Sequence, residues 1–187
     1  AVTMWRSSVI KLLILDVDGV LTDGKKYYNR DGEVVMKTFC DKDWTAIKRF
    51  KAIGINVIFL TGDPFNESIA KNRNIDCIVN RKDGTHTDKG DYLKDICKKY
   101  KVKPEQIAFV GDDIFDLGIM QKVKYKYCPA DAPEELQEIA TDILHESGGH
   151  NCIMVLWDTM RQAKLIPKYK ITDHLKNVYN LDIKEKF

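Results

Sequence analysis

Short apolar runs alternate along the chain with segments in which apolar residues recur every three or four positions. The runs predict β-strands that are buried on both faces, because such strands need apolar side chains at successive positions. The clearest runs span residues 9–17, 55–60 and 107–110, and shorter ones span 77–79 and 125–127. These five segments are the expected strands of a central sheet.

Helical patterns fill the intervals between the strands. Helices are expected over 43–53, from the Asp63-Pro64 pair onward, and over 89–100 and 133–140. An aspartate followed by proline is typical of a helix start, because aspartate caps free amides and proline suits the first helical position. Regular alternation of strands with helices predicts a doubly wound α/β fold with a parallel central sheet.

Residues 25–39 interrupt this alternation. Tyr27-Tyr28 and Val34-Val35 flank a polar turn there, and this pattern predicts a β-hairpin that projects just after the first strand. We expect residues 9–158 to form one domain. Residues 159–187 are expected to form a C-terminal tail, a helix plus an extension, packed on the body or on a neighbouring subunit.

Composition excludes several classes of protein. The 187 residues are 44% hydrophobic and 31% charged, with a net charge of +2, which is typical of a globular domain and favours neither nucleic acid nor membrane as a partner. No apolar run is long enough to span a bilayer. The five cysteines are widely spaced and form no Cys-x-x-Cys pair, which favours a reducing, cytoplasmic location over a disulfide framework or a zinc cluster.

Two acidic clusters follow predicted strands. Asp16 and Asp18 end the first strand beside glycine, and Asp112, Asp113 and Asp116 follow the strand 107–110. The first cluster taken alone could equally be a polar turn at the end of a strand. Because the carboxyl ends of parallel strands hold the ligands of open α/β sheets, the two clusters can converge there. Oxygen ligands of this kind suit Mg²⁺.

A hydroxyl and a lysine complete the set. Thr61-Gly62 ends the strand 55–60, and Lys89 opens a predicted helix. Taken singly, these are a turn hydroxyl and a surface lysine. Together with the acidic clusters they supply what phosphoryl transfer requires: a carboxylate nucleophile, a cation, hydroxyl and amide donors, and a fixed positive charge.

The ordered set of motifs resembles a known superfamily. Asp16-Val17-Asp18-Gly19-Val20, Thr61-Gly62, Lys89 and Gly111-Asp112-Asp113-x-x-Asp116 are similar to the four motifs of the haloacid dehalogenase superfamily of phosphatases. Segments 21–24, 130–134 and 147–149 are similar to the 3-deoxy-octulosonate 8-phosphate phosphatase branch, which includes nonulosonate 9-phosphate phosphatases. The resemblance covers residues 9–158. It implies a Rossmann-like three-layer sandwich without a cap domain.

The resemblance implies roles for the residues of both acidic clusters. Asp16 would attack phosphorus and form an aspartyl-phosphate, and Asp18 would protonate the leaving oxygen and then activate water. Mg²⁺ would be held by the carboxylates of Asp16 and Asp112 and by the backbone carbonyl of Asp18. Asp113 and Asp116 would support the metal waters and orient the lysine.

The same resemblance implies how the transferred phosphoryl group is bound. Thr61, the backbone amide of Gly62 and Lys89 would contact its oxygens. The intervals between these motifs are too short to hold a cap domain, which would normally exclude water from the site. In this branch, capless subunits assemble as tetramers whose hairpins close a neighbour's site, so a homotetramer with residues 27–35 at the interface is expected.

Three departures from the branch concern the substrate. Asp63 stands where an arginine is usual, Lys42-Asp43-Trp44 replaces Arg-Asp-Gly, and His150 replaces an arginine after two glycines. Arginines at the first and third positions would suit the carboxylate of a sugar acid. Lys42, Arg73 or Arg81 could compensate for their loss.

These features predict a Mg²⁺-dependent phosphatase acting on a phosphorylated sugar, most simply a 2-keto-3-deoxy sugar acid phosphate. One alternative is a non-catalytic tetramerisation module related to the C-terminal domain of sialic-acid cytidylyltransferases. Such modules tend to lose motif carboxylates or the lysine, whereas all are present here. A second alternative, a phosphatase for a macromolecular phosphate, requires a basic groove, and the lysines are spread too evenly to indicate one.

Overall fold

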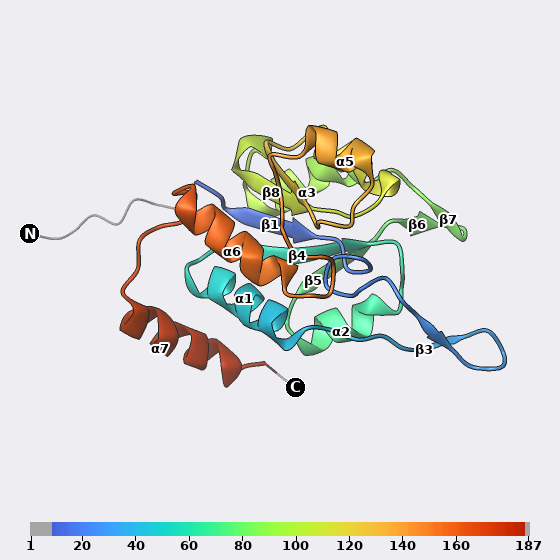
Figure 1. Cartoon of the computed structure of the whole chain (residues 1–187), viewed down its shortest axis with the longest axis horizontal. Helices are drawn as coiled ribbons and strands as arrows, with labels where there is room; N and C mark the ends of the chain where they lie inside the picture. The colour runs from blue at the N-terminus through green and yellow to red at the C-terminus, as the bar shows by residue number, and fades with distance from the viewer. Residues whose placement is uncertain (1–8, 186–187) are drawn as a thin grey trace, which may run out of the picture.

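A six-stranded parallel sheet forms the centre of the computed structural model, which describes residues 9–185 (Figure 1). The strand order is β10-β9-β8-β1-β4-β5. The strands are β1 (Leu12–Leu15), β4 (Asn56–Thr61), β5 (Asp76–Val79), β8 (Ile107–Val110), β9 (Tyr125–Cys128) and β10 (Asp142–Ile143). Each neighbouring pair is parallel. The expected α/β fold is confirmed, with the short edge strand β10 as an addition.

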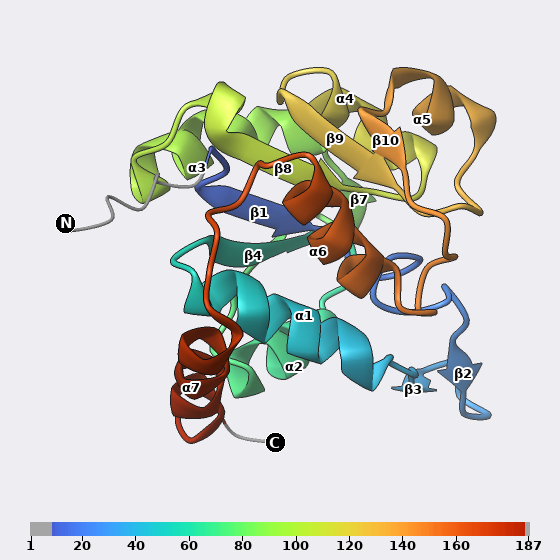
Figure 2. The same ribbon diagram turned by 60° about the vertical axis from the view of Figure 1, so that its left-hand side comes forward.

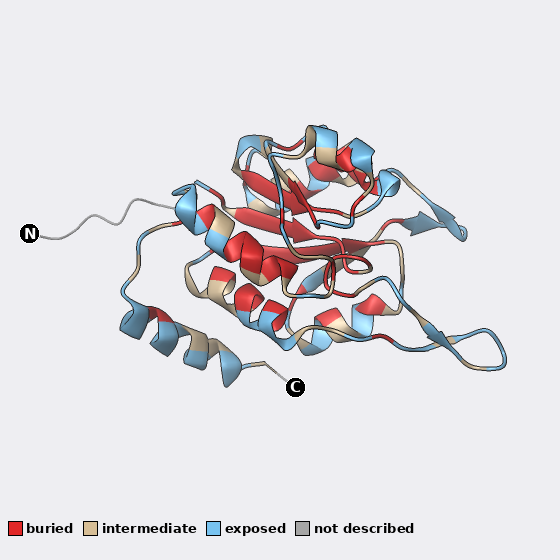
Figure 3. Ribbon diagram, in the orientation of Figure 1, coloured by how far each residue is buried: buried red, intermediate tan, exposed pale blue. Residues whose placement is uncertain are grey.

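Helices cover both faces of the sheet, which explains why its strands are apolar throughout. Leu13 and Leu15 of β1 point into one hydrophobic layer, whereas Leu12 and Ile14 point into the other. The first layer lies beneath α1 (Asp41–Ala52), α2 (Asn66–Asn72) and α6 (Cys152–Gln162). The second lies beneath α3 (Leu93–Tyr100), α4 (Leu117–Met120) and α5 (Glu134–Ile139). Figure 2 shows the sheet between these helices, and Figure 3 shows that its central strands are buried.

Two helices start later than expected, because aspartate side chains stabilise turns that precede them. The helix expected from Asp63-Pro64 begins at Asn66, because Asp63 Oδ1 accepts from the amide of Phe65 in the turn that precedes α2. Lys89 lies in a 3-10 turn that precedes α3, because Asp88 accepts from the amide of Gly90 and starts that turn. The 3-10 turns are η1 (Lys89–Tyr92), η2 (Pro104–Gln106) and η3 (Ile114–Asp116).

Two hairpins project from the carboxyl edge of the sheet (Figure 1). The expected one pairs β2 (Tyr27–Tyr28) with β3 (Val34–Met36). The other pairs β6 (Arg81–Lys82) with β7 (Thr85–His86) and was not predicted. Its signal is Asp83-Gly84, both with positive φ, as a two-residue hairpin turn requires. Within residues 9–185 these hairpins stand where a cap domain would be inserted, so the capless architecture is confirmed.

The C-terminal helix α7 (Ile171–Asp182) lies against α1 of the same chain (Figure 2). Arg49 donates to the hydroxyl of Tyr169 at 2.8 Å and to the ring nitrogen Nε2 of His174 at 3.2 Å. Lys51 forms an ion pair with Glu185 at 2.6 Å. Helix α6 runs across the expected domain boundary at residues 158 and 159, because its buried face continues through Met160. No helix within residues 9–185 is long and apolar enough to cross a membrane.

Asp43 ties α1 to the start of α6, and its loss is expected to destabilise the fold. Its buried Oδ1 accepts from the amides of Ile153 at 2.9 Å and Met154 at 3.3 Å. Asp43→Ala leaves both amides unpaired, which should lower the free energy of unfolding by about 1–3 kcal/mol. Urea denaturation measures this change. Asp41→Ala, an exposed first-turn aspartate of α1, is the control, and equal losses in the two variants would contradict the prediction.

Candidate active site

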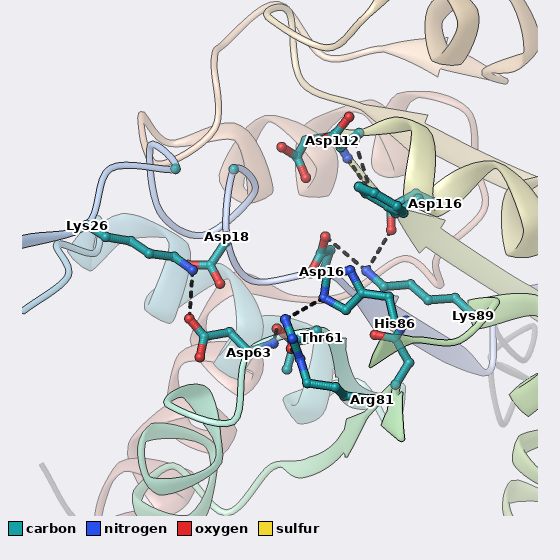
Figure 4. Close-up of a pocket in the computed structure, with 16 residues that line it drawn as sticks. Asp16, Asp18, Lys26, Thr61, Asp63, Arg81, His86, Lys89, Asp112 and Asp116 are labelled. Atoms are coloured by element: carbon teal, nitrogen blue, oxygen red, sulfur yellow. Dashed lines mark hydrogen bonds and ion pairs between the residues drawn. The ribbon is translucent and has the colours of Figure 1, made fainter. Parts of the chain in front are cut away.

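All eight predicted site residues line one pocket at the carboxyl ends of β1, β4 and β8 (Figure 4). The pocket has a volume of about 320 Å³, within the range of small-molecule sites. These residues are Asp16, Asp18, Thr61, Gly62, Lys89, Asp112, Asp113 and Asp116. Parallel pairing explains the convergence, because it places the ends of β1, β4 and β8 side by side at one edge.

Lys89 links the two acidic clusters at the base of the pocket. Its buried Nζ lies 3.0 Å from Oδ2 of Asp16 and 2.7 Å from Oδ1 of Asp116. Burial alone would lower the pKa of Lys89, but the two carboxylates outweigh that effect and raise the pKa. Lys89 therefore carries a fixed positive charge directly beside the Asp16 carboxylate.

Both carboxylate oxygens of Asp116 accept hydrogen bonds within the site. Its Oδ2 accepts from the amides of Asp112 at 2.9 Å and Asp113 at 3.2 Å, while its Oδ1 accepts from Lys89. It therefore fixes the loop after β8 and the direction of Lys89. Asp113 accepts from the amide of Ile114 and starts η3. Its side chain lies at the pocket edge.

The carboxylates of Asp16, Asp112 and Asp116 form a cluster in which one oxygen of each lies within 4.8 Å of the others. Burial raises the pKa of both Asp16 and Asp112, and repulsion by neighbouring carboxylates raises it further. Gly19 lets Asp112 approach, since a Cβ at that position would meet its Oδ2 at 1.8 Å. A buried cluster of like charges at this spacing suits a hard divalent cation.

Asp18 is held by residues that the sequence patterns did not indicate. The fully buried Nζ of Lys37 lies 2.7 Å from Oδ1 of Asp18, and Nδ2 of Asn66 donates to its Oδ2 at 3.1 Å. Asn66 also donates to the hydroxyl of Thr61 at 2.9 Å. Lys37 and Asn66 thus orient Asp18 and Thr61 together. A lysine just after a hairpin strand and an asparagine in a helix give no local signal of such a role.

Asp63 neutralises lysines at the same edge of the pocket. Its Oδ2 lies 2.8 Å from the Nζ atoms of both Lys26 and Lys37. Although partial burial acts in the opposite direction, these hydrogen bonds lower the pKa of Asp63. Asp63, the first of the three departures from the branch, therefore forms ion pairs with two lysines.

Arg81 is the one of the three suggested compensating residues that reaches the pocket. It lines the pocket together with His86 of the β6–β7 hairpin. Arg73 lies over the ring of Trp44, 4.3 Å from its centroid. Trp44 is buried in the core beneath α1, so the bulky ring that replaces a glycine of the branch lies away from the pocket. Lys42 is exposed and does not line it.

Comparisons with known proteins show which family has this sequence pattern and fold. The family of haloacid dehalogenase-like hydrolases matches residues 84–150, which contain Lys89 and the second acidic cluster. The chain is 33% identical over 162 residues to the 3-deoxy-D-manno-octulosonate 8-phosphate phosphatase KdsC of Salmonella typhi, covering 86% of this chain and 84% of that protein. The chain belongs to the haloacid dehalogenase-like hydrolases. It is a phosphatase of this family, as the motifs predict.

Two solved structures of phosphatases in this family resemble the fold closely. The cobalt-bound deoxy-D-mannose-octulosonate 8-phosphate phosphatase YrbI of Haemophilus influenzae has a TM-score of 0.74 at 31% identity, over 83% of this chain and 89% of that one. The Moraxella catarrhalis 3-deoxy-D-manno-octulosonate 8-phosphate phosphatase, in complex with a magnesium ion, a phosphate ion and KDO, has a TM-score of 0.72 at 25% identity, over 95% and 92%. The expected superfamily and branch are confirmed.

Proposed function

We propose that this phosphatase is Mg²⁺-dependent and hydrolyses a 2-keto-3-deoxy sugar acid phosphate, of the octulosonate 8-phosphate or nonulosonate 9-phosphate type. One observation carries the proposal: the Asp16 carboxylate lies 3.0 Å from the Lys89 ammonium, at the base of a pocket that also holds Asp18 and Asp112. A nucleophilic carboxylate beside a buried cation is suited to attack on a phosphoryl group, whose negative oxygens the cation neutralises.

The reaction proceeds in two displacements. An oxygen of Asp16 attacks phosphorus while the bond from phosphorus to the sugar oxygen breaks, and Asp18 gives that oxygen a proton. Asp18 then takes a proton from water, which attacks the aspartyl-phosphate and releases inorganic phosphate and free Asp16. Thr61, the amide of Gly62 and Lys89 bind the phosphoryl oxygens in both steps. Lys37 and Asn66 hold Asp18 in position.

Mg²⁺ would be held by the carboxylates of Asp16 and Asp112 and by the backbone carbonyl of Asp18. The cluster fits a divalent cation, because burial and repulsion raise the pKa of both carboxyl groups and a bound cation would relieve that repulsion. Asp116 already accepts from Lys89 and two amides, so we assign it, with Asp113, a supporting role. When bound, the ion supplies positive charge that stabilises the developing charge on the phosphoryl group.

A substrate screen tests the proposal. The purified chain with Mg²⁺ is assayed for phosphate release from octulosonate 8-phosphate, a nonulosonate 9-phosphate, sugar phosphates without a carboxylate, a phosphopeptide and a 5′-phosphorylated oligonucleotide. The highest kcat/KM is expected for one of the two sugar acid phosphates. Preference for the peptide or oligonucleotide would overturn the substrate class, and no turnover of any of these compounds would overturn catalysis of this kind.

We also propose that the chain forms a homotetramer through the β2–β3 hairpin. The hairpin exposes a cluster of large apolar side chains on its projecting strands: Tyr27, Tyr28, Val35 and Met36. Exposed apolar groups gathered on one projection favour a protein partner. In the absence of a cap, a neighbouring subunit's hairpin would cover the open side of the pocket.

Tyr28→Asp tests the assembly. Tyr28 is 60% exposed in the single chain, so the change should leave the monomer folded but place a charge in the apolar interface. At micromolar concentration we expect light scattering to show a tetramer for the wild type and dissociated subunits for Tyr28→Asp. The control is Ile143→Asp, at a 42% exposed residue of the edge strand β10. A monomeric wild-type chain with full activity would refute the tetramer.

A further inference from the structure

The β6–β7 hairpin forms part of the rim of the active-site pocket. Arg81 and His86 are directly opposite each other in its register. Arg81 Nε donates to the carbonyl of Gly62 at 2.9 Å, and a Cβ at Gly62 would meet the His86 ring at 2.4 Å. The His86 ring also packs edge-on against Phe115, with centroids 5.3 Å apart. The hairpin is therefore docked on the loop after β4 that carries Gly62 (Figure 4).

The guanidinium of Arg81 has a defined position because three neutral acceptors hold it. Besides the Gly62 carbonyl, it contacts the carbonyl of Gly84 at 2.9 Å and Nε2 of His86 at 2.8 Å. An arginine has five N–H donors, so two remain for a ligand. A cation held in place in this way loses little side-chain freedom when a ligand binds.

Arg81 also differs in charge balance from the other cations of the pocket. Lys26 pairs with Asp63, and Lys89 pairs with two carboxylates at the base. Lys37, behind the pocket, pairs with Asp18 and Asp63. No carboxylate of residues 9–185 forms a salt bridge with Arg81, whose side chain lies at the exposed rim. Its charge is therefore available to an anion brought by the substrate.

We infer that Arg81 is a specificity-determining residue that binds a carboxylate of the substrate remote from the phosphoryl group, and that His86 positions it. This inference rests on the proposed function and adds the recognition of the sugar acid. The phosphoryl group already has Lys89, Thr61 and the Gly62 amide at the base. A carboxylate matches the paired donors of a guanidinium better than it matches an ammonium. The exposed ring of Phe115, which lines the pocket beside the hairpin, offers a wall for the sugar chain.

The test compares Arg81→Gln with Lys82→Gln, which removes the same charge from the next residue of the hairpin. Lys82 is exposed and does not line the pocket. For Arg81→Gln we expect kcat/KM for octulosonate 8-phosphate to fall roughly 10- to 100-fold, as for a lost hydrogen bond to a charged group. The value for p-nitrophenyl phosphate, which has no carboxylate, should change less than about twofold. Lys82→Gln should leave both values unchanged.

Two results would overturn the inference. Equal losses on both substrates, with weaker inhibition by inorganic phosphate, would assign Arg81 to the phosphoryl group. No loss on octulosonate 8-phosphate would remove it from recognition altogether.

Calorimetry gives a readout that needs no turnover. Octulosonate 8-phosphate is titrated into Asp16→Asn and into Asp16→Asn/Arg81→Gln, with inorganic phosphate as the comparison. The carboxylate site is supported if the double variant binds the sugar acid phosphate more weakly but binds inorganic phosphate equally well. This result would support the site even where the wild type hydrolyses no ester and the proposed function fails. Equal affinities in the two proteins overturn the inference and leave the proposed function intact.

Discussion

Asp16→Asn is expected to lower phosphatase turnover by at least about 10⁴-fold, the scale at which enzymes lose activity when a covalent nucleophile is removed. The amide has the same shape as the carboxylate, so it can still accept from the amide of Val17, as Asp16 does at 2.7 Å. Lys89 keeps its ion pair with Asp116. The change therefore removes the attacking oxygen's charge while leaving the pocket in place.

Steady-state phosphate release under saturating Mg²⁺ measures this effect. The control is Asp95→Asn, at an exposed aspartate of α3 that does not line the pocket; it should retain wild-type turnover. Circular dichroism and thermal melting show whether each variant is folded. Because burial raises the pKa of Asp16, its charge is unfavourable in the metal-free fold, and we expect no fall in melting temperature. Turnover within tenfold of the wild type would exclude Asp16 as the nucleophile.

Removal of divalent cations by a chelator is expected to reduce turnover to background, and added Mg²⁺ to restore it. Without a cation, Asp16 and Asp112 repel each other in a buried cluster. A ligand that binds only the folded state stabilises it by mass action. Millimolar Mg²⁺ should therefore also raise the melting temperature of the wild type.

Asp112→Asn separates this site from general salt effects. It removes one predicted ligand, so both activity and the Mg²⁺-induced rise in melting temperature should be lost. Asp95→Asn should keep both. A wild type whose activity and melting temperature do not respond to chelation or to Mg²⁺ would contradict the proposed metal dependence.

The sequence predicted the layered fold and the location of its chemistry because both depend on local patterns. Continuous apolar runs occur where a strand is covered on both faces, and β8 begins and ends where its run does. The acidic clusters and Thr61 stand at the ends of these runs, whereas Lys89 opens the turn η1 after the β6–β7 hairpin. Parallel pairing then brings the strand ends together at one edge.

Helix α6 and the β6–β7 hairpin lacked a sequence signal strong enough to predict them. Helix α6 follows a glycine-rich loop and begins at a residue next to Asn151, which makes no capping hydrogen bond; Asp43, far away in sequence, accepts from its first amides instead. The β6–β7 hairpin has strands of only two residues. Its Asp83-Gly84 turn was the one available indication of a hairpin.

The sequence by itself determined the α/β fold, the carboxylates and lysine expected at the site, and the absence of room for a cap between the motifs. Only the tertiary structure decided which of the pocket's cations are neutralised. Asp63 pairs with Lys26 and Lys37, whereas Arg81 is held by neutral acceptors. The physical reason is distance: whether two charges cancel depends on a few ångströms of separation in space, and residues of several different elements meet at this pocket.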